Sequence, residues 1–181
     1  MSKICPLFSG STGNSTYIEG ATGAVLTDAG ASCKALTAAI QNAGGGIEKI
    51  AAVVITHEHI DHIKGLKPLL NAARDAVLIS SAQTLETLAA AGKIPPHTKT
   101  AAIESETLEA GGIAISRFAT NHDAVAPGGY CFLMPDGRKI SVCTDLGIMT
   151  DTVRSAIAGS DAVSGKLTIN LGLLSAKEGK L

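Results

Sequence analysis

The sequence predicts a layered α/β domain, and three observations favour that fold class. Strand-like runs are followed by helix-like runs twice along the chain, as in a sheet that is covered by helices. The hydrophobic fraction of 45% and the mean hydropathy of +0.27 exclude an intrinsically disordered chain. The length of 181 residues is sufficient for one domain, or two small ones, with a substantial core.

The first half of the chain predicts four strands and one helix. The strands are expected at Ile4–Phe8, Ser15–Ile18, Ala24–Asp28 and Ala51–Thr56, and a Gly/Ser loop joins the first two. The fourth run is apolar at nearly every position, which is typical of a strand that is buried on both faces. A helix is expected over Cys33–Ala43, because Leu36 and Ile40 share one face, Ser32 can cap it and Gly44 can end it.

The second half alternates in the same way. Pro68 interrupts a helical stretch, and since proline is tolerated in a first turn, a helix is expected to begin near it. The other expected elements are strands at Val77–Ser80, Ile113–Phe118, Tyr130–Met134 and Lys139–Thr144 and helices at Gln83–Ala91 and Asp151–Ala158. The turn Pro135–Gly137 should join the last two strands as a hairpin.

Composition excludes several classes of function. Fifteen Lys and Arg against 16 Asp and Glu give a net charge of −1, so no bulk attraction to DNA or to a membrane is expected. Aromatic residues make up 3% with no Trp, which disfavours an aromatic platform for stacking bases. The N-terminus has no signal-like apolar core, and no apolar run reaches the ~20 residues of a membrane span. Four scattered cysteines without a CxxC pair indicate free thiols in a reducing cytoplasm, so we expect a cytoplasmic protein with no membrane partner.

Three of the five histidines lie within six residues, in the segment His57-Glu-His59-Ile-Asp61-His62. In an extended segment that leaves a strand, residues i and i+2 point the same way, so His57 and His59 can bind one metal ion. Where the chain turns into a helix, Asp61 and His62 project toward a neighbouring position. Neutral imidazole and carboxylate are ligands of Zn²⁺, Mn²⁺ and Fe. This spacing, directly after a buried strand, therefore predicts a metal site.

The HxHxDH segment resembles the signature of the metallo-β-lactamase superfamily, and the resemblance covers roughly residues 1–164. It implies an αβ/βα four-layer sandwich over 1–164, followed by a divergent tail over 165–181. Asp28 matches the family's early Asp, which orients the metal loop, and His122 matches the third histidine of the first metal site. Asp145 matches the carboxylate that bridges the two ions. The opening segment 8–15 is similar to that of a bacterial branch of small cytoplasmic members, which includes nucleases that act from 5′ DNA ends.

The resemblance also implies how two divalent ions would be held. The expected ligands are His57, His59 and His122 for the first ion, Asp61 and His62 for the second, and Asp145 as the bridge. Zinc is the expected metal, with manganese or iron as alternatives. A metal-bound hydroxide would attack the substrate, and Asp61 would orient it or take its proton, which makes Asp61 the expected catalytic residue.

The C-terminal part departs from the family pattern. Members of the family carry a further second-site histidine and closing elements, whereas no histidine follows His122 in this chain. We therefore expect a fold that is incomplete at the C-terminus, with Leu167, Ile169 and Leu171 able to fill one strand position. Three consequences stay open: a second ion that binds weakly, a homo-oligomer that supplies the ligand and covers an open sheet edge, or an abbreviated form of a larger enzyme.

Three functions follow from these residues. The first is a metal-dependent hydrolase of phosphodiesters, with nucleic acid as the substrate. The second keeps the site but hydrolyses a small-molecule ester, such as a thioester or lactone, or a β-lactam. The third is a metal-binding domain with weak or no catalysis, because the late histidine is missing.

Overall fold

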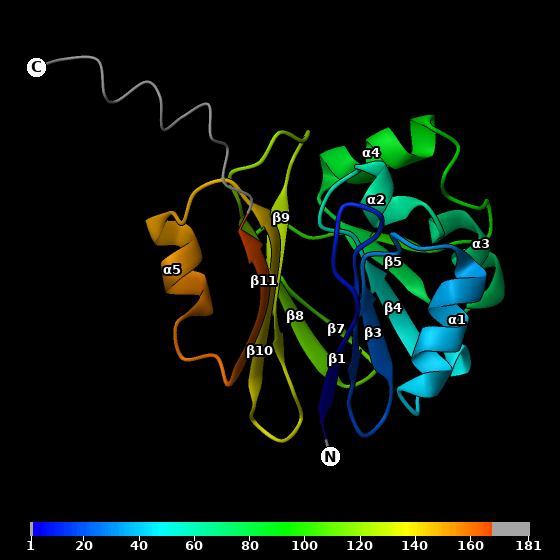
Figure 1. The fold of residues 1–181 in the computed structure, drawn as a ribbon, viewed down its shortest axis with the longest axis horizontal. Coiled ribbons are helices and arrows are strands. Elements are labelled where there is room, and N and C mark those ends of the chain that lie inside the picture. The colour runs from blue at the N-terminus through cyan, green and yellow to red at the C-terminus, as the bar shows by residue number, and fades with distance from the viewer. Residues whose placement is uncertain (1, 168–181) are drawn as a thin grey trace, which may run out of the picture.

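The computed structural model describes residues 2–167 and contains two β-sheets packed face to face, with helices outside each one (Figure 1). The first sheet has six strands, in spatial order β1 (Lys3–Phe8), β2 (Ser15–Glu19), β3 (Ala24–Thr27), β4 (Ile50–Val54), β5 (Val77–Ser80) and β6 (Thr100–Ala102). Strands β1 to β3 are antiparallel neighbours, and β3 to β6 are parallel. Parallel strands need crossover connections, which the helices supply.

The second sheet has five strands, in spatial order β11 (Ala162–Leu167), β10 (Lys139–Leu146), β9 (Gly128–Leu133), β8 (Ile113–Ala119) and β7 (Thr107–Ala110). Its neighbours are antiparallel except for β11, which runs parallel to β10. The predicted hairpin turn joins β9 to β10, and Gly137 takes the positive φ of 83° that the turn needs.

The helices divide between the two outer faces. Outside the first sheet lie α1 (Cys33–Asn42), α2 (Ile60–Ile63), α3 (Leu66–Ala72) and α4 (Ala82–Ala90), and outside the second lies α5 (Asp151–Ile157) (Figure 1). A single 3₁₀ turn, Ile47–Lys49, precedes β4. Ser32 caps α1 as predicted, since its side chain accepts a hydrogen bond from the Ala35 N–H. No helix within residues 2–167 has the length and apolar character needed to cross a membrane.

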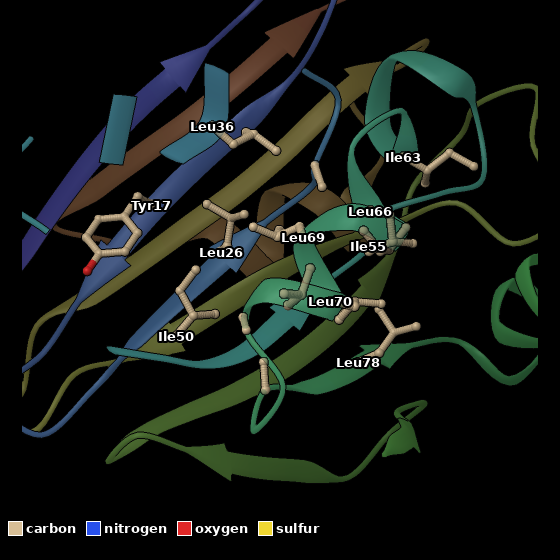
Figure 2. Close-up of a cluster of buried hydrophobic side chains, with 14 of the residues drawn as sticks. Tyr17, Leu26, Leu36, Ile50, Ile55, Ile63, Leu66, Leu69, Leu70 and Leu78 are labelled. Carbon is tan, nitrogen blue, oxygen red and sulfur yellow. The ribbon is translucent and has the colours of Figure 1, made fainter. Parts of the chain in front are cut away.

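Three apolar cores separate four layers. One core lies between the first sheet and its helices, where Leu26, Leu36 and Leu69 are fully buried (Figure 2). A second core, with Val54, Ile115 and Phe132 among its members, fills the space between the sheets. Adjacent residues of one strand reach different cores, because side chains alternate across a sheet. The third core lies under α5, so the predicted α/β four-layer sandwich is confirmed.

Several element boundaries differ from the sequence-based expectations. Helix α3 begins at Leu66, two residues before Pro68, because proline at the third helical position lacks only an N–H that would have no helical partner. Strands β6 and β7 were not predicted, since both are short and only half-buried, with weak patterns. Strand β11 crosses the predicted boundary at 164/165, and the part of the expected tail beyond Leu167 lies outside the described residues.

Candidate metal centre

The predicted ligands come from the ends of separate strands. His57 follows β4, and the short helix α2 carries Asp61 and His62 directly after it. His122 lies in the loop between β8 and β9, and Asp145 lies near the end of β10. The two sheets therefore bring residues that are far apart in the sequence to one edge of the sandwich, which is the usual position of a site in a layered α/β fold.

A first group consists of three histidines. One ligand atom each from His57, His59 and His122 lies within 4.8 Å of the others. The Nε2 atom of His122 is 3.3 Å from Nδ1 of His59, and the ring of His57 is tilted edge-on to both. His57 is buried, with 1% of its surface exposed, whereas His59 and His122 are half-buried. The group is thus closed at its base and accessible from outside.

Burial favours the neutral form of two imidazoles of the first group, those of His57 and His122. Burial, together with the positive charge of neighbouring histidines, lowers the pKa of His57 to about 2. Burial also lowers the pKa of His122. The Nδ1 atom of His57 is 3.0 Å from the Thr56 hydroxyl, but its buried Nε2 has no hydrogen-bond partner. A buried polar atom without a partner is costly, and a bound cation would satisfy it.

Asp28 organises the loop that carries the histidines. Its carboxylate accepts hydrogen bonds from the backbone N–H and the hydroxyl of Thr56, at 2.9 and 3.0 Å to Oδ1. Its Oδ2 is 2.8 Å from Nδ1 of His62. One buried carboxylate thereby fixes the residue before His57 and the ring of His62, which agrees with the role expected of Asp28.

A second group places His62 between two carboxylates. Its Nε2 is 2.7 Å from Oδ2 of Asp145 and 3.6 Å from Oδ2 of Asp61. Ligand atoms of His57, His62 and Asp145 lie within 4.8 Å of one another, and all three residues are buried. Burial alone would lower the pKa of His62, but Asp28 and Asp145 raise it to about 10. Although burial raises the pKa of Asp145, hydrogen bonds from His62 and Lys166 hold it well below its usual range.

Two of the three aspartates near His62, Asp28 and Asp145, share an uncommon backbone conformation. Asp28 has φ +61° and Asp145 has φ +51°, and they are the two non-glycine residues with positive φ in the described part of the chain. Aspartate tolerates the left-handed region better than most residues, yet the conformation still has a cost. Both residues lie at the end of a strand, and both carboxylates contact the imidazole of His62. The strained backbone therefore occurs at the positions that place these carboxylates in the site.

The Gly/Ser loop after β1 packs against this assembly. The Asn14 amide donates to Oδ2 of Asp61 at 3.0 Å, and the Asn14 N–H donates to the carbonyl of Asp61 at 2.8 Å. Gly30 packs against the backbone of both residues, and a Cβ at this position would collide with the carbonyl of Asp61 and the N–H of Asn14. The loop therefore packs against the ligand groups, and its contacts position Asp61.

The structure brings all six predicted site residues to one region, and five of them form two overlapping groups. His57, His59 and His122 form the first group, whereas Asp61 stands beside the second rather than within it. Sequence reasoning missed the roles of Asn14, Thr56 and Lys166. The first two had a signal, because one lies in the Gly/Ser motif and the other directly precedes His57. Lys166 had none, since it lay beyond the predicted end of the domain.

The donor set fits divalent cations. Imidazole nitrogens with one or two carboxylates suit zinc, manganese or iron, and the partnerless Nε2 of His57 is the kind of atom that a resident ion would satisfy. Within residues 2–167, the two groups above are the clusters of three or more such ligands.

Comparison with known proteins agrees with this geometry. A family model described as a beta-lactamase superfamily domain matches residues 24–169. Exodeoxyribonuclease YycJ of Bacillus anthracis is 34% identical over 157 residues, covering 86% of this chain and 59% of the relative. Exodeoxyribonuclease WalJ of Streptococcus pneumoniae is also 34% identical, over 88% of this chain and 60% of its own length. The chain thus spans about 60% of the length of these curated relatives.

Solved structures show the same architecture. A metallo-β-lactamase with a HARLDQ motif from Cronobacter sakazakii superposes with a TM-score of 0.71, at 17% identity, over 90% of this chain and 76% of its own. Such low identity establishes the fold, whereas the family match covers most of the sequence. This chain belongs to the beta-lactamase superfamily and has the metallo-β-lactamase fold.

Proposed function

We propose that this protein is a metal-dependent hydrolase that acts on the phosphodiester bonds of nucleic acids. The observation that carries the proposal is the buried His57, whose Nε2 lacks a protein partner and whose ligand atom lies within 4.8 Å of those of His59 and His122. We assign the first ion to these three histidines. We assign a second ion to Asp61 and His62, with Asp145 as the bridge, and zinc is the metal that this donor set favours.

A divalent cation at these side chains would act as a Lewis acid and lower the pKa of a water molecule toward about 7. Asp61 is then the residue that orients this water or accepts its proton. The hydrogen bond from Asn14 fixes one of its oxygens, while 23% of its side chain stays exposed and within reach of a substrate. Asp28 holds the loop of His57 and the ring of His62 in place throughout.

The names of the relatives support the choice of substrate. Two relatives that match most of this chain are exodeoxyribonucleases, and a more distant one from Bradyrhizobium diazoefficiens, at 26% identity, is a ribonuclease Z. A net charge of −1 gives no bulk attraction to DNA, so recognition would depend on the metal centre and on local contacts. A hydrolase of thioesters, lactones or β-lactams would use the same centre and is the alternative that the test must separate.

The test loads the full chain with zinc or manganese and offers single-stranded and duplex DNA labelled at the 5′ or 3′ end. RNA, bis-(p-nitrophenyl) phosphate, a thioester, a lactone and a β-lactam complete the panel. We expect chelator-sensitive cleavage of DNA, and end-labelling shows whether it starts at the 5′ end. Turnover of a thioester, lactone or β-lactam without cleavage of any phosphodiester would contradict the proposal. Absence of all turnover in a metal-loaded preparation would favour the metal-binding domain without catalysis.

The role of Asp61 can be tested by Asp61→Asn, which keeps the shape and the contact with Asn14 but removes the basic carboxylate. A lost general base typically costs about 10²–10⁴ in rate. We expect a loss in that range with the first ion still bound, and a changed dependence of the rate on pH. An unchanged pH profile would remove Asp61 from the reaction.

Three further predictions belong to this proposal. The four cysteines are unpaired, as in proteins of a reducing compartment, so we propose a cytoplasmic location.

Each sheet has two edge strands in the described part of the chain, namely β1, β6, β7 and β11. A homo-oligomer that covers one of these edges stays a prediction, and sedimentation would test it. The division into a domain over 1–164 and a tail over 165–181 also stays a prediction.

A further inference from the structure

Lys166 reaches the second ligand group from the edge of the second sheet. It lies on β11, which pairs in parallel with β10, and the register shifts between Cys143 and Leu146, beside Asp145. Its Nζ is 2.8 Å from Oδ1 of Asp145, and 32% of its side chain is exposed. Because Oδ2 of the same carboxylate is 2.7 Å from Nε2 of His62, a nitrogen atom contacts each oxygen of Asp145.

The position of Lys166 distinguishes the two ligand groups. Asp145 belongs to the second group and not to the first, which consists of three imidazoles. An ammonium on the bridging carboxylate offsets the negative charge that a second dication needs, and it repels that dication directly. An ion at the first group has three imidazole ligands besides the bridging carboxylate, whereas two of the three ligands assigned to the second ion are carboxylates. The effect of the lysine should therefore be felt mainly by the second ion.

The surroundings allow the lysine to remain or to withdraw. A cavity of about 370 Å³ lies between β1–β3 and the pair β10–β11, and Asn14, Asp28, Thr144 and Lys166 are among its lining residues. The cavity adjoins the second group, because Asp28 contacts His62. The lysine side chain thus has space into which it can move when a cation competes for Asp145.

On the basis of the proposed metal centre, we propose that Lys166 is a built-in cation that weakens the second metal site. The chain then holds one ion tightly at His57, His59 and His122, and takes a second only at higher metal concentration, when the ammonium leaves Asp145. Lys166 would thus set the metal concentration at which the chain passes from one bound ion to two. The competing explanation is a structural ion pair, which would tie β11 to β10 without affecting the metal.

The test measures stepwise binding of Zn²⁺ to the metal-free full chain by equilibrium dialysis, and of Co²⁺ by its visible absorption. Lys166→Gln removes the charge but keeps a hydrogen-bond donor, whereas Lys166→Met keeps only the aliphatic stem. Lys49→Gln is the matched control, since Lys49 also pairs with a carboxylate, that of Glu19, which belongs to neither ligand group. Thermal unfolding shows whether each variant is folded, and Lys166→Gln decides alone if Lys166→Met is not.

We expect the first equivalent to bind equally in all four proteins. The second should tighten by about tenfold in both Lys166 variants, which corresponds to one removed charge in a partly exposed pair, and not in the control. If the second affinity is unchanged or lower in the Lys166 variants while the first equivalent binds normally, the inference is wrong and the metal centre stands. If the wild-type protein binds no first equivalent, the proposed function and this inference both fail.

Discussion

The two groups of metal-ligating side chains share His57 but differ in what stabilises them without a metal. In the first group, three imidazoles face one another with no carboxylate among them, and burial lowers the pKa of His57 to about 2. In the second, Asp28 and Asp145 hold His62 and raise its pKa to about 10. His57 of the first group is therefore neutral, and its Nε2 has no hydrogen-bond partner. In the second group, by contrast, the carboxylate of Asp145 is already paired with the ring of His62 and with Lys166.

This difference indicates an order of metal binding. A cation that binds the first group displaces no proton from His57, because that ring is already deprotonated at neutral pH. A cation that binds the second group must displace the proton that His62 holds between two carboxylates, and metal binding is weakened by each proton it must release. The first group can thus bind a metal ion without releasing a proton from His57, whereas the neighbouring second group must first release the proton of His62.

The largest effect should follow from removing the residue that the two groups share. We expect His57→Ala to lose the first metal equivalent, with a fall in affinity above the ~100-fold that loss of a supporting residue causes. DNA cleavage should fall with it. Metal analysis after dialysis is the measurement. His97→Ala is the control, because His97 is exposed in a loop, and within residues 2–167 its side chain hydrogen-bonds only to the carbonyl of Leu70. Normal metal content in His57→Ala would refute the assignment.

Asp28 should matter almost as much, through stability. Asp28→Ala would leave Nδ1 of the buried His62 ring and the buried backbone N–H of Thr56 without their partner, and breaking a buried pair costs about 3–5 kcal/mol. Asp28→Asn should lose less, since asparagine tolerates the positive φ and still accepts a hydrogen bond from Thr56. Urea denaturation of the metal-free protein measures both. Equal losses for the two variants would show that the charge on Asp28 is the whole effect.

Asn14 should have a smaller effect that is confined to the second group. Asn14→Ala removes the hydrogen bond that fixes Asp61, and loss of such supporting contacts typically weakens metal binding by about 10–100-fold. We expect a loss at the lower end of this range for the second equivalent, measured by dialysis, and an unchanged first equivalent. A loss that fell on the first equivalent would mean that the Gly/Ser loop supports the wrong group in our account.

A last effect is expected on the stability of the metal-free protein as pH changes. The pKa of His62 is raised on folding, so its contribution is complete below about pH 6.5 and is lost as pH rises through about 10. The pKa of His57 is lowered on folding, so its contribution is present above about 6.5 and declines as pH falls toward 2. Urea denaturation in chelator should show both declines. His57→Gln should flatten the acid side alone.

Much of the fold was accessible from the sequence, because long-range layering follows from local patterns. The buried run before His57 predicted β4, and the caps at Ser32 and Gly44 predicted the limits of α1. Strands β6 and β7 were missed because neighbouring strands, rather than their own weak patterns, hold them in place. Pro68 located the start of α3 to within two residues, since proline fits the third helical position as well as the first.

The identities of the site residues could be predicted from the sequence, but their charge states and contacts could not. The HxHxDH spacing gave four of them, and the resemblance gave His122 and Asp145 from their positions after strands. The charge state was not predictable, because it depends on tertiary contacts: Asp28 and His62 are 34 positions apart, and His62 and Asp145 are 83 apart. The ion pair of Lys166 was hidden for the same reason, since it needs the parallel pairing of β11 with β10.

The most direct test of the account is a calorimetric titration of the metal-free chain with Zn²⁺ at neutral pH, in buffers of different ionisation enthalpy. We expect two steps, a tight first equivalent that releases fewer protons and a weaker second equivalent that releases the proton of His62. Two equivalents that bind together with equal affinity and equal proton release would contradict it, because the two groups would then be equivalent.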